Sequence, residues 1–200
     1  MDPLAKIRSF PPAPPPNDDA TAIRGNMSTE DKQLVANILA YHVRHYPGST
    51  AFAHDVMKDM KVVEVNVRDV SRGDAAPHKE AECVFEITVA DGMLNIHDAL
   101  HGGCAAHMMD YVTFSSLFAL GISQRIDASG VSQTMNITWY APAPRGTVLR
   151  FVSTTLSLGG RIESSRAEVY NKATGRLLIS GTQTIAPVPI GSKQGRTAKL

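Results

Sequence analysis

A single carboxylate stands in the middle of a long apolar stretch of this 200-residue chain. The stretch runs from Leu100 to Gly121 and reads LHGGCAAHMMDYVTFSSLFALG, with Asp110 as its only acid. An ionised carboxylate is costly to bury among apolar side chains unless it is hydrogen-bonded. We therefore predict that Asp110 does chemical work, as a base that activates water. The alternative is an idle, solvated side chain at a point where the helix reaches the surface.

Three residues that suit an oxyanion site open the same stretch. His101, Gly102 and Gly103 stand where the helix should begin, and the first amides of a helix have no internal acceptor and carry its positive dipole end. Glycines there let another group approach the backbone, so a polarised carbonyl could be held by these amides. The alternative is that the two glycines only permit tight packing between the helix and a sheet.

The spacing of Gly102 and Asp110 decides whether one chain can use both. Eight residues of helix separate them by about 12 Å along the axis, and the two positions are rotated by about 80°. One helix cannot bring both groups to a single atom, whereas two copies related by a twofold axis can. If both residues are catalytic, the sequence predicts a homodimer with two shared sites.

A second glycine pair could bind phosphate. The segment SLGGRI joins two predicted strands and offers exposed turn amides beside a guanidinium, from Ser157, Gly159, Gly160 and Arg161. An ordinary hairpin turn explains the same residues equally well. His97 and His107 are neighbours of His101 in the sequence, but no shell of cysteines or acids accompanies these histidines at metal-ligand spacing, so no metal is expected.

The strands and the helix that hold these residues can be predicted from the spacing of the apolar residues. Residues 61–188 alternate with a period of two on both sides of the long helix, which predicts two strands, the helix and four more strands. Short connections favour an antiparallel sheet, and the nearly all-apolar helix must be covered. We therefore expect an α+β fold with a curved antiparallel sheet wrapped around one long central helix.

Three further segments flank this predicted domain. Residues 1–27 hold six of the twelve prolines and are expected to form a disordered arm, and residues 28–60 a helical extension. Residues 189–200 are expected to be a flexible tail that ends in AKL, the form of a peroxisomal address. We therefore expect a peroxisomal location, with the cytoplasm or the mitochondrion as alternatives.

Composition excludes several classes of protein. The 20 basic and 19 acidic residues nearly cancel and form no basic block, so neither nucleic acid nor an anionic membrane surface is an expected partner. No run of 18 apolar residues occurs, so no membrane span is expected. Cys83 and Cys104 alone make no disulfide framework, and a reducing compartment fits better.

The pattern resembles the hotdog fold, and its residues look like those of the PaaI-like acyl-CoA thioesterases of the thioesterase superfamily member 2 type. The residues that carry this resemblance are Asn95, LHGG at 100–103, Asp110, GVS at 130–132, MNITWYAP at 135–142 and NKATG at 171–175. The histidine–glycine motif is weak alone. Together with the acid nine residues after the histidine and Asn95 six residues before it, the set is specific.

The resemblance implies a role for each catalytic candidate. Gly102, in the HGG motif with Gly103, would donate its amide to the thioester oxygen, and Asp110 would act as general base or nucleophile. Asn95 would orient the attacking water or the acid, and Ser132 would hydrogen-bond that water. His101 would anchor the loop and the start of the helix.

The resemblance also implies the substrate and the assembly. Coenzyme A, as part of the substrate and not a separate cofactor, would lie along the hairpin at 157–161 and the segment at 139–145, with Trp139, Tyr140, Pro142 and Arg145. Dimers in such families often pair into tetramers. The acyl group, fatty or arylacetyl, is left open, and Met108, Met109, Tyr111, Phe114 and Leu117 either shape its pocket or belong to the core. A hydratase of acyl thioesters and a non-catalytic acyl-CoA binding module are the alternative functions.

Overall fold

The computed structural model describes residues 2–43, 50, 52–71, 73 and 77–187. In chain order its helices and strands are α1 (Ala5–Arg8), α2 (Thr29–His42), α3 (His54–Met57), β1 (Lys61–Val70), β2 (His78–Thr88), α4 (Gly102–Gln124), β3 (Gly130–Trp139), β4 (Val148–Ser157), β5 (Glu163–Asn171) and β6 (Leu177–Pro187). The predicted order of two strands, a long helix and four strands is confirmed.

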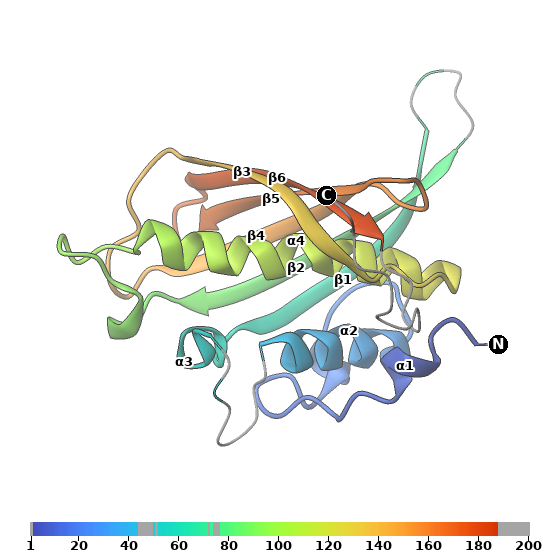
Figure 1. Cartoon of the computed structure of the whole chain (residues 1–200). Coiled ribbons are helices and arrows are strands. Elements are labelled where there is room, and N and C mark those ends of the chain that lie inside the picture. The colour runs from blue at the N-terminus through green and yellow to red at the C-terminus, as the bar shows by residue number, and fades with distance from the viewer. Residues whose placement is uncertain (1, 44–49, 51, 72, 74–76, 188–200) are drawn as a thin grey trace, which may run out of the picture.

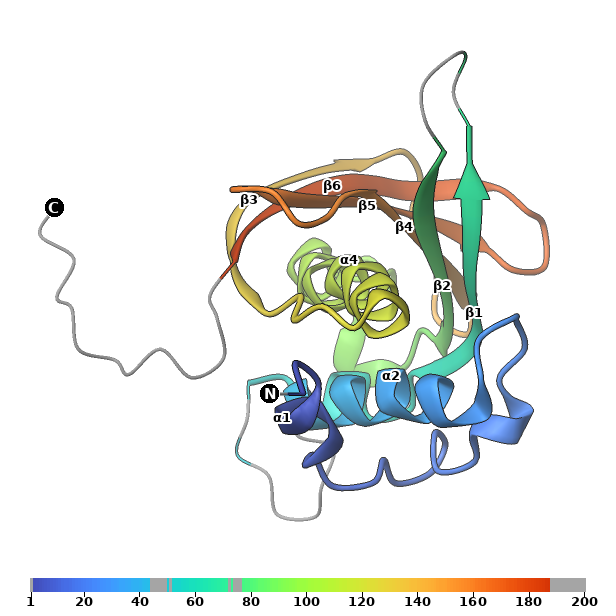
Figure 2. The ribbon, with the colours of Figure 1, turned by 90° about the vertical axis from the view of Figure 1, so that its right-hand side faces the viewer.

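The six strands form one sheet in the order β1-β2-β4-β5-β6-β3, and all of their pairings are antiparallel (Figure 1). The sheet curves around α4, and α2 lies against α4 on the side that the sheet leaves open (Figure 2). This arrangement confirms the predicted α+β fold with one central helix. It also means that α4 is covered by the sheet and by the N-terminal extension.

The core lies between α4 and the concave face of the sheet. Met108, Met109, Val112 and Leu117 of α4 are completely buried and share the core with Phe85 and other apolar residues of the sheet. One side of the first half of α4 is less covered than the sequence predicted, because Cys104, Ala106, His107 and Asp110 keep partial exposure.

The N-terminal segment differs from the predicted disordered arm. Leu4, Ile7 and Ala13 are buried at 0–3% exposure, and the ring of Phe10 stacks on Tyr41 of α2 with centroids 4.0 Å apart. The expectation of disorder is therefore wrong for residues 2–27. The physical reason is that the prolines prevent regular structure without preventing packing, and the apolar residues between them fill the surface of α2.

Residues 188–200 lie outside the described residues. The predicted flexible tail and the AKL address fall on this segment, so both stay predictions. In the part of the chain that is described, no helix has the length and apolar character needed to cross a membrane.

Candidate active site

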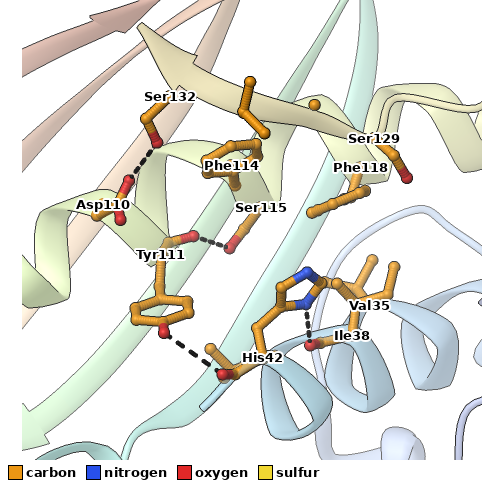
Figure 3. Close-up of a pocket in the computed structure, with 13 residues that line it drawn as sticks. Val35, Ile38, His42, Asp110, Tyr111, Phe114, Ser115, Phe118, Ser129 and Ser132 are labelled. Atoms are coloured by element: carbon orange, nitrogen blue, oxygen red, sulfur yellow. Dashed lines mark hydrogen bonds between the residues drawn. The ribbon is translucent and has the colours of Figure 1, made fainter. Parts of the chain in front are cut away.

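Asp110 is held from the sheet by two side chains. Ser132 at the start of β3 donates its hydroxyl to Asp110 Oδ1 at 2.9 Å (Figure 3). Gln183 of β6 donates its Nε2 to the same carboxylate oxygen and also to Ser132 Oγ, the latter at 2.8 Å. Within the described residues no hydrogen bond reaches Asp110 Oδ2. One oxygen is thus fixed and the other is left to accept a proton from a bound molecule.

A β-bulge aims Ser132 at Asp110. In the pairing of β3 with β6, Ser132 lies opposite Ile185 and Thr134 lies opposite Thr184. A step of two residues along β3 therefore corresponds to a step of only one residue along β6. Thr134 bonds to the hydroxyl of Thr184 at 2.7 Å, while Ser132 bonds to Gln183, which faces the other side of the sheet. Because of the bulge, Ser132 points toward α4.

Gln183 is a site residue that was not predicted from the sequence. This side chain is 1% exposed, and its Oε1 accepts a hydrogen bond from Thr113 Oγ1 on α4. Its amide is therefore oriented, with the oxygen toward the helix hydroxyl and the nitrogen toward Asp110. The one signal in the sequence is a polar residue at an inward position of β6, between the inward-facing Gly181 and Ile185.

Gly102 lies at the other end of the first half of α4. His101 caps this helix, because its Nδ1 accepts a hydrogen bond from the Gly103 amide at 3.0 Å. Among the described residues, no acceptor is bound to the Gly102 amide. A Cβ on Gly102 would lie 3.9 Å from the indole of Trp139, so this free amide stands beside the end of β3.

Asn95 belongs to the Gly102 end as well. Its Oδ1 accepts from the amides of His97 and Ala99, at 2.8 and 3.3 Å, and so fixes the loop before α4. Asn95 lines a cavity of about 310 Å³ together with Trp139 and its neighbours Tyr140 and Pro142. Asp110 and Ser132 are not among the residues that line this cavity. The predicted catalytic residues therefore form two groups in one chain, about 12 Å apart along α4.

The predicted coenzyme A residues are also divided within one chain. The hairpin of Ser157, Gly159, Gly160 and Arg161 joins β4 to β5, and the register places Glu163 opposite Ile185 of β6. Trp139 lies opposite Ile179 of β6, on the order of 20 Å further along that strand. Arg145 is near the Trp139 end and already pairs with Asp98 at 2.9 Å and with Asp91.

The electrostatics of the site disfavour Cys104 as a nucleophile and keep the two nearby histidines neutral. Burial raises the pKa of the Cys104 thiol to about 11, so this thiol is protonated at neutral pH. Desolvation lowers the pKa of His42 and of His107, although the nearby charge of Asp110 partly opposes the shift. Within the described residues, no three His, Cys, Asp or Glu side chains are grouped as metal ligands.

A cavity of about 330 Å³ adjoins Asp110 (Figure 3). It lies between α2, α4 and the start of β3, and Asp110 and Ser132 form part of its lining. Of the candidates for an acyl pocket, Tyr111 and Phe114 line this cavity. Met108, Met109 and Leu117 are buried in the core instead.

Comparisons with known proteins give the family of this chain. The family model described as the thioesterase superfamily matches residues 97–177. Human acyl-coenzyme A thioesterase 13 is 34% identical over 110 residues, which cover 55% of this chain and 74% of the relative, and the mouse protein of the same name is also 34% identical over 110 residues, with the same coverage.

Two solved structures of the same type share the fold. Zebra fish thioesterase superfamily member 2 superposes with a TM-score of 0.55 at 25% identity, covering 75% of this chain and 96% of that chain. Thioesterase superfamily member 2 of Mus musculus gives a TM-score of 0.54 at 25% identity, covering 80% of this chain and 98% of that chain. The chain belongs to the thioesterase superfamily. It is a thioester hydrolase with the hotdog fold.

Proposed function

We propose that this protein hydrolyses acyl-CoA thioesters to a free acid and coenzyme A, with Asp110 as the base that activates water. The observation that carries the proposal is the asymmetric environment of the Asp110 carboxylate. Ser132 and Gln183 hold one oxygen, and no described group bonds to the other. The relatives named acyl-coenzyme A thioesterase 13 support the substrate class.

In the proposed reaction the Asp110 group of residues acts first and the Gly102 amide acts next. A water held by Ser132 and Asp110 attacks the thioester carbonyl carbon as its proton passes to Asp110. The carbonyl oxygen becomes an oxyanion, which the free amide of Gly102 stabilises at the positive end of α4. The carbon–sulfur bond then breaks, and the leaving thiolate of coenzyme A takes up the proton.

This mechanism requires two chains, because Gly102 and Asp110 of one helix cannot reach the same carbonyl. The exposure of the edge strand β3 supports such a dimer. This strand is an edge of the sheet, and Val131, Met135 and Trp139 on it are 56, 37 and 50% exposed. Unpaired edges of this kind are templates for pairing with another strand. Antiparallel pairing of two β3 strands about Met135 would place Ser132 of one chain near the Trp139 end of the other.

The same pairing would unite the divided coenzyme A residues. It reverses the direction of the second chain, so the hairpin at 157–161 of one chain approaches the end of the other chain that carries Tyr140 and Arg145. A phosphate would then compete with Asp91 and Asp98 for the Arg145 guanidinium. Assembly of two such dimers into a tetramer stays a prediction.

Release of free thiol from a panel of acyl-CoAs tests the proposed activity. Asp110→Asn keeps the shape of the side chain but removes the base, so we expect kcat to fall by about a hundredfold or more. The matched control is Asp69→Asn, on an exposed carboxylate of β1 that pairs with Lys79, and it should stay within about twofold of the wild type. Hydrolysis by Asp110→Asn at the control rate would refute the proposed base. Binding of acyl-CoA by the wild type without any turnover would favour a binding module.

A further inference from the structure

The cavity beside Asp110 extends from the candidate base along α4 (Figure 3). Asp110 and Ser132 line one end, and the cavity continues along α4 past Phe114 to Phe118 (Figure 3). Eight residues of helix between Asp110 and Phe118 correspond to about 12 Å. A group that enters past Asp110 therefore has room to extend parallel to α4.

Two facing walls of this cavity are apolar, and the hydroxyls of Ser115 and Ser129 lie in the lining beside them. Val35, Ile38 and Leu39 of α2 form one wall, and the stacked rings of Phe114 and Phe118, with centroids 5.9 Å apart, form the facing wall. A surface of this kind favours a hydrocarbon group over a polar or charged one.

His42 completes the wall without adding a charge at neutral pH. Its Nδ1 donates to the carbonyl of Ile38 at 2.8 Å, and desolvation lowers its pKa. Of the described residues that line the cavity, Asp110 is the only Asp, Glu, Lys or Arg.

We propose that this cavity binds the acyl chain of the thioester and that α2 sets the length of chain accepted. The inference rests on the proposed acyl-CoA thioesterase function and names its substrate class, an unbranched fatty acyl chain. At about 30 Å³ for each group of the size of a water molecule, a cavity of about 330 Å³ holds on the order of ten methylene groups.

The position of α2 makes this wall a fixed part of the site. The Tyr111 hydroxyl of α4 donates to the carbonyl of His42 at the end of α2, at 3.3 Å. Asp31 in the first turn of α2 pairs with Arg125, the residue that follows α4, at 3.3 Å. Both ends of α2 are therefore tied to α4, the helix that carries Asp110. Since α2 precedes the matched thioesterase region at 97–177, this wall is contributed by the N-terminal extension.

The test measures kcat/KM for saturated acyl-CoAs from butyryl to palmitoyl with two variants of Ile38. Ile38→Phe fills the cavity. The kcat/KM for the longest good substrates should therefore fall at least about tenfold relative to the kcat/KM for butyryl-CoA, as expected for crowding an apolar pocket. Ile38→Ala enlarges the cavity, so the preferred chain should lengthen by about two carbons. Leu34→Ala is the matched control, because Leu34 is buried on the same helix but does not line the cavity. Its chain-length profile should match that of the wild type.

Val35→Leu provides a milder second variant if Ile38→Phe does not fold, and it should shift the profile toward shorter chains. An unchanged profile in all cavity variants, or a wild type that prefers aryl or polar acyl groups, would overturn the assignment of this cavity and leave the thioesterase function standing. Absence of hydrolysis of every acyl-CoA by a folded wild type would instead overturn the proposed function itself.

Discussion

Gln183 and Asp110 lie 73 residues apart in the chain, yet the Gln183 amide donates a hydrogen bond directly to the Asp110 carboxylate. Gln183 also bonds to Ser132, so one buried side chain connects both residues that would hold the attacking water. The orientation of the candidate base thus depends on a strand at the far end of the sequence.

A carboxylate at position 183 should disturb the ionisation of the base. In Gln183→Glu two carboxyl groups would meet at hydrogen-bond distance, and they cannot both ionise easily. We expect the acidic limb of the pH profile of kcat/KM to move to higher pH, because the pair keeps a proton that the wild-type site has lost. The control is Thr182→Glu, which adds the same charge on the exposed opposite face of β6. Superimposable profiles for Gln183→Glu and the control would argue against contact between positions 183 and 110 in solution.

Glu163 should make stability depend on pH. It is 2% exposed, its Oε2 has no hydrogen-bond partner among the described residues, and desolvation raises its pKa above the usual 4.5. Because its pKa is raised in the folded state, the contribution of Glu163 to the free energy of unfolding is fully present below about pH 4.5. This contribution is lost as the pH rises through the pKa that Glu163 has in the folded protein.

Replacing this carboxyl group by an amide removes the ionisation. Glu163→Gln should therefore be more stable than the wild type at pH 7 and nearly equal to it at pH 4, in urea unfolding at both values. Glu82→Gln, a half-buried position on β2 that pairs with Arg68, is the control. A stability gain for Glu163→Gln of the same size at pH 4 and pH 7 would show that ionisation is not its cause.

The packed N-terminal arm predicts resistance to proteases. Ile7 is 2% exposed in α1, and truncation of such a side chain costs about 2–5 kcal/mol where the site cannot relax. Because the arm can open locally, we expect Ile7→Ala to accelerate cleavage within residues 2–27 by at least about tenfold. Lys6→Ala changes the exposed neighbour and should cleave at the wild-type rate. Equal cleavage rates for the two variants would instead support the disordered arm that the composition predicted.

The sequence allowed the fold and one part of the site to be predicted. The period of two and the unbroken apolar helix determine the order of the elements along the chain, and Asp110 stands out because it is the single acid in that helix. The bulge that turns Ser132 toward Asp110 leaves no mark in a pattern of alternation, and the contact with Gln183 depends on strand register. The arm was misjudged because proline content indicates irregular backbone, whereas the burial of Leu4 and Ile7 depends on a surface formed by α2.

We expect Gly102 of one chain and Asp110 of another to act on the same carbonyl. Gly102→Pro removes the amide donor at the first position of α4, where proline is tolerated in helices. Each of Gly102→Pro and Asp110→Asn should be inactive alone. A mixed dimer places both changes in one site and leaves the other site intact.

Thiol release by mixed dimers, isolated through two different affinity tags and shown to be folded, is the most direct measurement. The shared-site geometry predicts recovery of about half the activity of a wild-type dimer. A folded mixed dimer with no more activity than its two parents would contradict the assignment of Gly102 and Asp110 to one site made by two chains.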